Sequence, residues 1–111
     1  MAPRSDPDRP SIRVETIHQG HVVRISLAGE ADIGSLATLQ AALDGVEPDG
    51  ARAVQLQIAD LAFVDIAALR ALATFAAQMK STGRNVTTCE ARPVVVKVAR
   101  ILDVDDHLGL S

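Results

Sequence analysis

The sequence predicts an α/β fold in which a singly wound, mixed or mostly parallel sheet of four to five strands carries its helices mainly on one face. In segments 22–28, 53–58 and 85–89, apolar residues alternate with polar ones, which is typical of strands with only one buried face. Segments with apolar residues at helical spacing lie between the strand segments. Asp32 and Asp65 each follow a strand segment and precede a helical one, where an aspartate caps the helix.

The four strand segments occur in a simple order. Residues 12–17 and 22–28 are rich in β-formers and flank the turn-like sequence HQGH at 18–21, which predicts a hairpin. Residues 53–58 and 85–89 form two later strands. In the segment 53–58, Val54, Leu56 and Ile58 point to one side and the two glutamines between them to the other. Helices are therefore expected to cover one face of the sheet only.

Three helices are predicted between and after these strands. The first has a single apolar stripe formed by Leu36, Leu39, Leu43 and Val46. The second covers about residues 66–82 and ends at Gly83, a typical C-cap. The third begins at Pro93, a good first helical residue, but the three valines that follow favour a strand by propensity. An apolar stripe at positions 95, 98 and 102 favours the helix.

Length and composition indicate one domain, expected over residues 11–111, behind a disordered leader at 1–10 that contains three prolines and four charged residues. A net charge of −3 and the lack of Tyr and Trp argue against nucleic-acid binding. No apolar run approaches the roughly 20 residues of a membrane span, and no signal peptide is evident. A cytoplasmic protein without membrane insertion is expected. Cys89 is interpreted as a small strand residue.

The segment FVDIAAL at residues 63–69 resembles the signature of the STAS domain, the module of anti-sigma factor antagonists. In that family an Asp-Ser-Ser/Thr-Gly-Leu run places a phosphorylated hydroxyl at the start of a helix. Asp65 and Leu69 keep the pattern, Ile66 and Ala67 replace the two hydroxyl residues, and Ala68 replaces the glycine. The resemblance therefore implies a STAS domain in which the phosphoacceptor serine is replaced by alanine at position 67.

Two further blocks extend the resemblance over about residues 13–110. LAGEAD at 27–32 is similar to the family's Leu-x-Gly-Glu-Leu-Asp element, and VARILDVDDHL at 98–108 is similar to its closing helix and tail. The resemblance implies the STAS fold and supports a helix after Pro93. It also implies a bacterial regulatory protein that acts in transcription regulation by partner switching, through protein–protein interaction.

The implied partner is an anti-sigma factor of the serine kinase type. The alternative is a STAS subunit that is not phosphorylated and binds the ATPase of an ABC-type phospholipid transport complex. Self-association is left open. Steps of three and four residues from Ala67 define one face of the second helix, which from the residues alone is interpreted as a solvated face with alanines chosen for helix propensity. The resemblance implies instead that this face and the neighbouring loops dock the partner. The partner-binding set that it implies is Asp32, Asp65, Ile66, Ala67, Ala68, Arg70, Ala71 and Thr74.

An enzymatic interpretation depends on Asp32 and Asp65, which would lie at the same edge of a parallel sheet, as an acid–base or metal-binding pair would. Helix capping is the preferred interpretation, because no histidine lies nearby in sequence to complete a ligand set. The sequence predicts no enzyme, no metal site and no cofactor. If phosphorylation occurs, the remaining hydroxyl candidates are Ser35, Thr38, Thr74, Ser81 and Thr82.

Overall fold

The computed structural model describes residues 12–110, so the leader predicted at 1–10 lies outside the described residues. The elements follow one another along the chain as β1 (Ile12–Gln19), β2 (Val22–Ala31), a 3₁₀ turn η1 (Ile33–Ser35), α1 (Leu36–Asp44), β3 (Ala53–Val64), α2 (Ile66–Ser81), β4 (Asn85–Cys89), α3 (Pro93–Ile101) and α4 (Asp105–Leu108).

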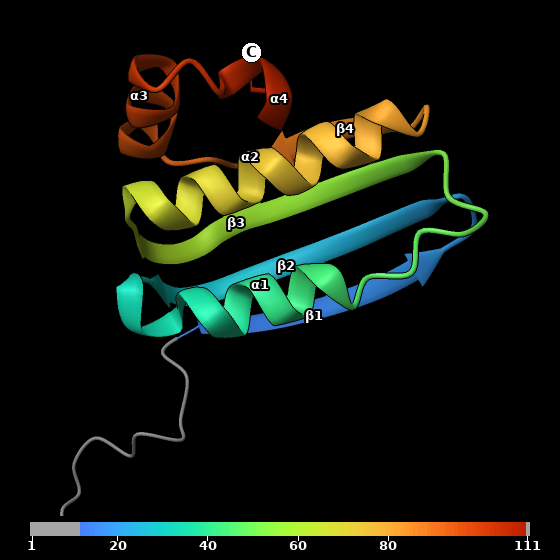
Figure 1. Ribbon diagram of the computed structural model, residues 1–111, viewed down its shortest axis with the longest axis horizontal. Helices are drawn as coiled ribbons and strands as arrows, with labels where there is room; N and C mark the ends of the chain where they lie inside the picture. Colours follow the sequence, from blue (N-terminus) through green and yellow to red (C-terminus); the bar gives the residue numbers. More distant parts are fainter. Residues whose placement is uncertain (1–11, 111) are drawn as a thin grey trace, which may run out of the picture.

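The described strands form one sheet in the order β1-β2-β3-β4. β1 and β2 pair antiparallel as the predicted hairpin, whereas β2 with β3 and β3 with β4 pair parallel. Figure 1 shows α1 and α2 lying side by side over the same face of this sheet. The predicted α/β class, with a singly wound and mostly parallel sheet, is therefore confirmed.

The core lies between the sheet and this helical layer. In β2 and β3 the residues Val23, Ile25, Leu27, Val54 and Leu56 are at most 1% exposed, as the alternation predicts. From the helices, the leucines of α1 and α2 complete the layer at positions 39, 43, 69 and 72. Each fully buried Val, Ile or Leu side chain stabilises the fold by about 1.5 to 3 kcal/mol relative to exposure. This layer packs the sheet against α1 and α2.

β3 contains two irregularities near its C-terminal end. Gln57 pairs with Ser26, yet Asp60 pairs with Ala28, so β3 has one extra residue in this interval. A second shift follows before Phe63, which pairs with Glu30. The bulges change which side chains face inward, because an extra residue reverses the alternation. As a result, Leu61 is buried while the Phe63 side chain is 52% exposed, and the strand continues to Val64, beyond its predicted end at residue 58.

The C-terminal segment packs beside β4. α3 is helical despite its valine run, because Val95 and Ala99 are buried on one face. α4 was not predicted as a helix. After it, Gly109 has φ +68°, and a Cβ there would lie 2.2 Å from the carbonyl oxygen of Val86, so only glycine fits. Thr88 Oγ1 donates a hydrogen bond to the carbonyl oxygen of Leu108 at 2.5 Å.

Candidate functional site

The C-terminal ends of β2 and β3 meet at one edge of the sheet. Ala31 pairs with Val64, and these are the last residues of the two strands. Asp32 and Asp65 follow them directly, so the two aspartates lie at the same edge, as predicted. The main-chain N–H of Asp65 also donates to the carbonyl oxygen of Ala31 at 2.9 Å. The start of α2 is thereby attached to the end of β2.

Asp32 caps the turn that leads into α1. Its Oδ1 accepts a hydrogen bond from the main-chain N–H of Ser35 at 3.0 Å, and Ser35 Oγ accepts one from the N–H of Asp32 at 3.0 Å. This reciprocal pair is a capping box. Ser35 is fully buried and its hydroxyl also donates to the carbonyl oxygen of Glu30 at 2.9 Å. The hydroxyl is thus part of the structural framework of the edge and is inaccessible to a kinase.

Asp65 caps α2 in the same way. Its backbone is extended, with φ −91° and ψ 175°, and its Oδ1 accepts a hydrogen bond from the N–H of Ala68 at 2.8 Å. The Asp65 carbonyl oxygen accepts the N–H of Leu69 at 2.9 Å and so begins the helical hydrogen-bond ladder. A carboxylate here satisfies a free first-turn amide and lies at the positive end of the helix dipole. The capping predicted from sequence is confirmed for both aspartates.

An exposed apolar surface lies immediately beside these caps. Phe63 and Ile66 are 52% and 53% exposed, and Ala67 is exposed between Ile66 and the buried Ala68. We call Phe63, Ile66 and Ala67 the α2-start surface. Phe63 and Ile66 are three residues apart in the chain, and large apolar side chains that gather on the surface are typical of contact surfaces for another molecule. Phe63 was not predicted, although the charge of Asp60 at a position that strict alternation places inward signals the bulge that turns Phe63 outward.

The outward face of α2 continues this surface. Arg70 and Thr74 are exposed and Ala71 is half-buried, so these predicted residues follow the α2-start surface along the helix. Ala68 requires a correction. Its side chain is fully buried in the core and cannot contact a partner directly, because it points to the sheet with Leu69. Ala68 contributes its main-chain N–H to the Asp65 cap instead.

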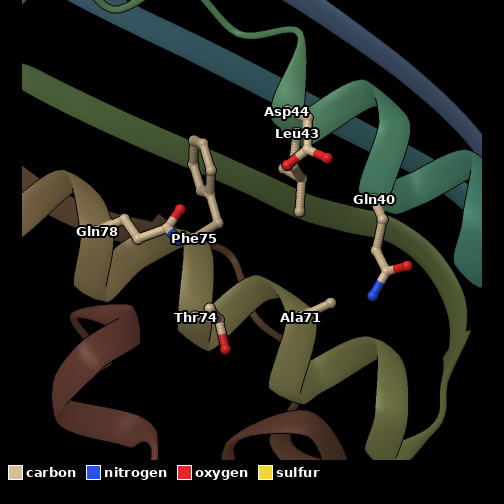
Figure 2. A pocket seen from close by; sticks show the side chains of 7 residues that line it. All are labelled: Gln40, Leu43, Asp44, Ala71, Thr74, Phe75 and Gln78. Carbon is tan, nitrogen blue, oxygen red and sulfur yellow. The ribbon is translucent and has the colours of Figure 1, made fainter.

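Two grooves run along the sides of α2. The first lies between α1 and α2, has a volume of about 380 Å³, and is lined by Gln40, Leu43, Asp44, Ala71, Thr74, Phe75 and Gln78, as Figure 2 shows. The second, of about 580 Å³, separates α2 from the C-terminal segment, with Leu102, Val104 and His107 opposite Arg70. Thr74 and Gln78 line both grooves. The outer face of α2 is therefore a ridge with a groove on each side.

The histidines and carboxylates of the described residues are dispersed over the fold. Within residues 12–110, no group of three or more His, Cys, Asp or Glu side chains is placed to hold a metal ion. His18 Nε2 is hydrogen-bonded to the carbonyl oxygen of Glu47 at 2.9 Å, and His21 Nδ1 to that of Gly50 at 3.1 Å, both outside the edge that carries Asp32 and Asp65. Asp32 and Asp65 act in the structure as helix caps.

The hydroxyl candidates differ in accessibility. Ser81 and Thr82 are exposed, but each donates to a main-chain carbonyl at 2.7 Å, that of Gln78 and that of Met79 respectively. Thr38 and Thr74 are exposed on α1 and α2, and Thr74 lies about 12 Å along α2 from Ile66 at 1.5 Å per residue. No side-chain oxygen is present at positions 66 and 67, the first two residues of α2.

The chain is similar to known proteins in sequence and in fold. The family model described as "Mlab, STAS domain" matches residues 14–110. No curated protein matches the chain. The structure of an anti-sigma factor antagonist from Mycobacterium paratuberculosis is similar with a TM-score of 0.74 and 24% identity, covering 96% of this chain and 89% of that one. The anti-sigma factor antagonist SpoIIAA in its unphosphorylated form is similar with a TM-score of 0.64 and 15% identity, covering 81% and 82%.

These similarities agree with the fold that the sequence resemblance implied. At such identities the structural likeness shows a shared fold, whereas the family model covers nearly all of the described residues. No helix in the described part of the chain is long and apolar enough to cross a membrane.

Proposed function

The chain belongs to the STAS domain family, and from this premise we propose that it is a regulatory protein-binding module that docks its partner through the α2-start surface and the outward face of α2. The observation that carries the proposal is the exposure of Phe63 and Ile66, about half of each side chain, directly beside the capped start of α2. Burying such side chains against a partner is favourable by about 25 cal/mol per Å². Binding, and no chemical reaction, is the proposed activity.

The position of this surface supports docking. Both caps hold the strand ends and helix starts in place, so the exposed Phe63 and Ile66 are presented on a rigid frame. Arg70 and Thr74 add polar groups along the helix, which gives an apolar centre with a polar margin. This arrangement is common in protein–protein interfaces. Asp32 shapes the adjacent margin of the surface.

The proposed partner is an anti-sigma factor of the serine kinase type, acting with this protein in the cytoplasm. The support is the fold shared with two anti-sigma factor antagonists. In the usual switch of this family, phosphorylation at the helix start adds about −1.5 to −2 charges and separates the partners. Position 67 is an alanine, so we propose binding that is not released by phosphorylation at this position.

A second partner class is favoured by the same lack of a hydroxyl. If no phosphate is ever placed at the start of α2, the partner need not be a kinase. The alternative is the ATPase of an ABC-type phospholipid transport complex, bound through the same surface. The two classes predict the same residues at the interface and different proteins across it.

Affinity purification from the native host, followed by mass spectrometry, tests both statements. The wild-type chain is expected to recover a serine kinase under the first alternative or an ABC ATPase under the second. Ile66→Asp is expected to lose that protein, because the new charge would be desolvated in an apolar contact at a cost of several kcal/mol.

A matched control comes from the opposite face of the sheet. Thr87 is exposed on β4 and lies away from the α2-start surface, so Thr87→Asp introduces the same charge and should leave recovery unchanged. Equal recovery by wild type and Ile66→Asp would place the interface elsewhere, and recovery of neither protein class would contradict the proposed partners.

A further inference from the structure

The first strand of the chain has an open side. β1 is the terminal strand of the sheet, and within residues 12–110 only β2 pairs with it. An edge strand presents unpaired N–H and C=O groups that can accept another strand. Figure 1 shows β1 at the border of the sheet, with α1 covering the face beside it. The outer side of β1 can therefore accept a strand of another chain.

The charges of Arg13 and Glu15 restrict which strand can pair with β1 and in which register. Both are exposed and both point to the face of the sheet away from the helices, where they lie opposite Ala28 and Ser26 of β2. Ala28 and Ser26 carry no charge, and the carboxylate of Asp60 lies one strand further on, where Asp60 pairs with Ala28 and lines the same pocket as Arg13 and Glu15. Within residues 12–110, neither Arg13 nor Glu15 forms an ion pair. Among the described residues, β1 therefore carries two opposite charges that no residue of β2 neutralises.

From this pattern we propose that β1 pairs antiparallel with β1 of a second copy, in a register centred on Val14. In this register each Arg13 lies directly opposite Glu15 of the other copy, with Cβ atoms about 4.5 to 5.5 Å apart, so two ion pairs form across the junction. Val14 lies opposite its own equivalent and Ile12 opposite Thr16, all on the core side. The two sheets join into one continuous sheet.

Neighbouring registers are excluded by the same charges. Centring the pairing on Arg13 places Arg13 opposite Arg13 of the other copy, and centring it on Glu15 places Glu15 opposite Glu15. Directly opposed like charges are destabilising. Centring it on Thr16 places Arg13 opposite Gln19 and Glu15 opposite Ile17, which satisfies neither. Registers offset by one residue turn the helical layers to opposite faces, because side chains alternate along a strand.

The flank of α1 that faces the open strand is compatible with a close neighbour. Gln40 and Asp44 line the groove toward α2. At 100° per residue, the flank on the other side of the buried stripe carries Thr38 and Ala42, and Gly45 follows at the C-cap. Packed helices have interaxial distances of about 8–10 Å, which depend on the side chains at the contact. Two α1 helices can therefore lie side by side across the junction.

This dimer is independent of the proposed partner and is tested with the full-length chain alone. Sedimentation velocity from about 1 µM to 1 mM covers the range of weak to moderate association. Wild type is expected to pass from one 11.7 kDa chain to twice that mass as concentration rises. Arg13→Glu and Glu15→Arg should each weaken the dimer at least tenfold, because each places like charges opposite one another.

The two variants also supply a rescue experiment. In a mixture of Arg13→Glu and Glu15→Arg, both junction pairs again join opposite charges, so a heterodimer should form with near wild-type affinity. The double variant, which exchanges the two charges, should restore the homodimer. Thr87→Glu on β4 serves as a control with a remote charge and should dimerise like wild type. Far-ultraviolet circular dichroism verifies that each variant is folded.

Three results would overturn the proposal: a wild-type chain that stays monomeric at 1 mM, a dimer unaffected by Arg13→Glu, or a mixture that associates no better than either variant alone. The rescue distinguishes a specific junction from a general effect of charge, since the mixture contains the same two folded variants that fail separately.

Discussion

The main-chain N–H of Asp65 donates to the carbonyl oxygen of Ala31 at 2.9 Å, which joins the first residue before α2 to the last residue of β2. The Asp65 side chain then caps α2 through Ala68, while Asp32, next to Ala31, caps the turn before α1. One hydrogen bond therefore relates the two helix starts. The position of the α2-start surface depends on this hydrogen bond and on the two caps. The contribution of the Asp65 cap can be tested directly.

Asp65→Ala should destabilise the fold by about 0.5 to 2 kcal/mol, because the first-turn amide loses its acceptor and the helix dipole a favourable charge. Chemical denaturation at neutral pH measures the change. Asp65→Asn is the matched control and should remain close to wild type, since asparagine is an equally good N-cap. An unchanged midpoint for Asp65→Ala would show that the cap contributes nothing to stability.

Ala67 and Ala68 are adjacent and should respond oppositely to glutamate. Ala67 is exposed in the first turn of α2, where a carboxylate is favoured by about 0.3 to 1 kcal/mol, so Ala67→Glu should fold normally yet bind the recovered partner much more weakly. Ala68 is fully buried, so Ala68→Glu should lose more than about 3 kcal/mol. Denaturation curves measure stability and titration calorimetry measures binding.

A variant Ala67→Ser should fold and bind like wild type, because the hydroxyl is small and lies on the exposed side of α2. Wild-type affinity for Ala67→Glu in the same titration would contradict the docking assignment. Loss of folding in Ala67→Glu would contradict the exposure of this residue, and the two failures are distinguished by the denaturation curve.

Incubation with ATP and a serine kinase of the anti-sigma type should leave the start of α2 unmodified, because neither Ile66 nor Ala67 has a side-chain oxygen. Intact-mass measurement with peptide mapping detects any phosphate. Ala67→Ser is the positive control and should gain one phosphate at position 67. Stoichiometric phosphate on Thr74 of the wild type would show that the switch has moved along α2.

Gly109→Ala should destabilise the fold by about 2 kcal/mol or more, because the added Cβ combines left-handed backbone strain with a 2.2 Å approach to the Val86 carbonyl oxygen. Gly20 is the control. It also has a positive φ, +60°, but no atom lies within 4 Å of its Cβ position, so Gly20→Ala should lose only about 1 kcal/mol. Equal losses measured by denaturation would remove the contact at Val86 from the explanation.

The sequence was sufficient for the elements whose patterns are local. Alternation in 22–28 and 53–58 and the two capping aspartates led to the correct strands, helix starts and covered face. The bulges in β3 were not predicted, because they depend on pairing with β2. The exposure of Phe63, which follows from the bulges, was not predicted for the same reason. Ala68 was placed on the surface by motif, whereas helical geometry sends its side chain to the core beside Leu69.

The third helix is a case in which local propensity favours the wrong structure. Propensity alone favours a strand for the valines after Pro93, and burial of Val95 and Ala99 overrides it. The residues that dock a partner remain a prediction, because the affinity of a surface depends on a second molecule that this chain does not specify.

The two edge strands of the sheet, β1 and β4, differ in whether another chain can pair with them. At β4, the backbone of Gly109 lies against Val86 and Thr88 is bonded to Leu108, so that border is occupied by the chain's own tail. At β1 no such covering exists among the described residues. If another copy can add only at the β1 edge, each chain can join one other chain, and assembly stops at the dimer. The glycine at position 109 would then help keep copies of this protein from joining into fibres.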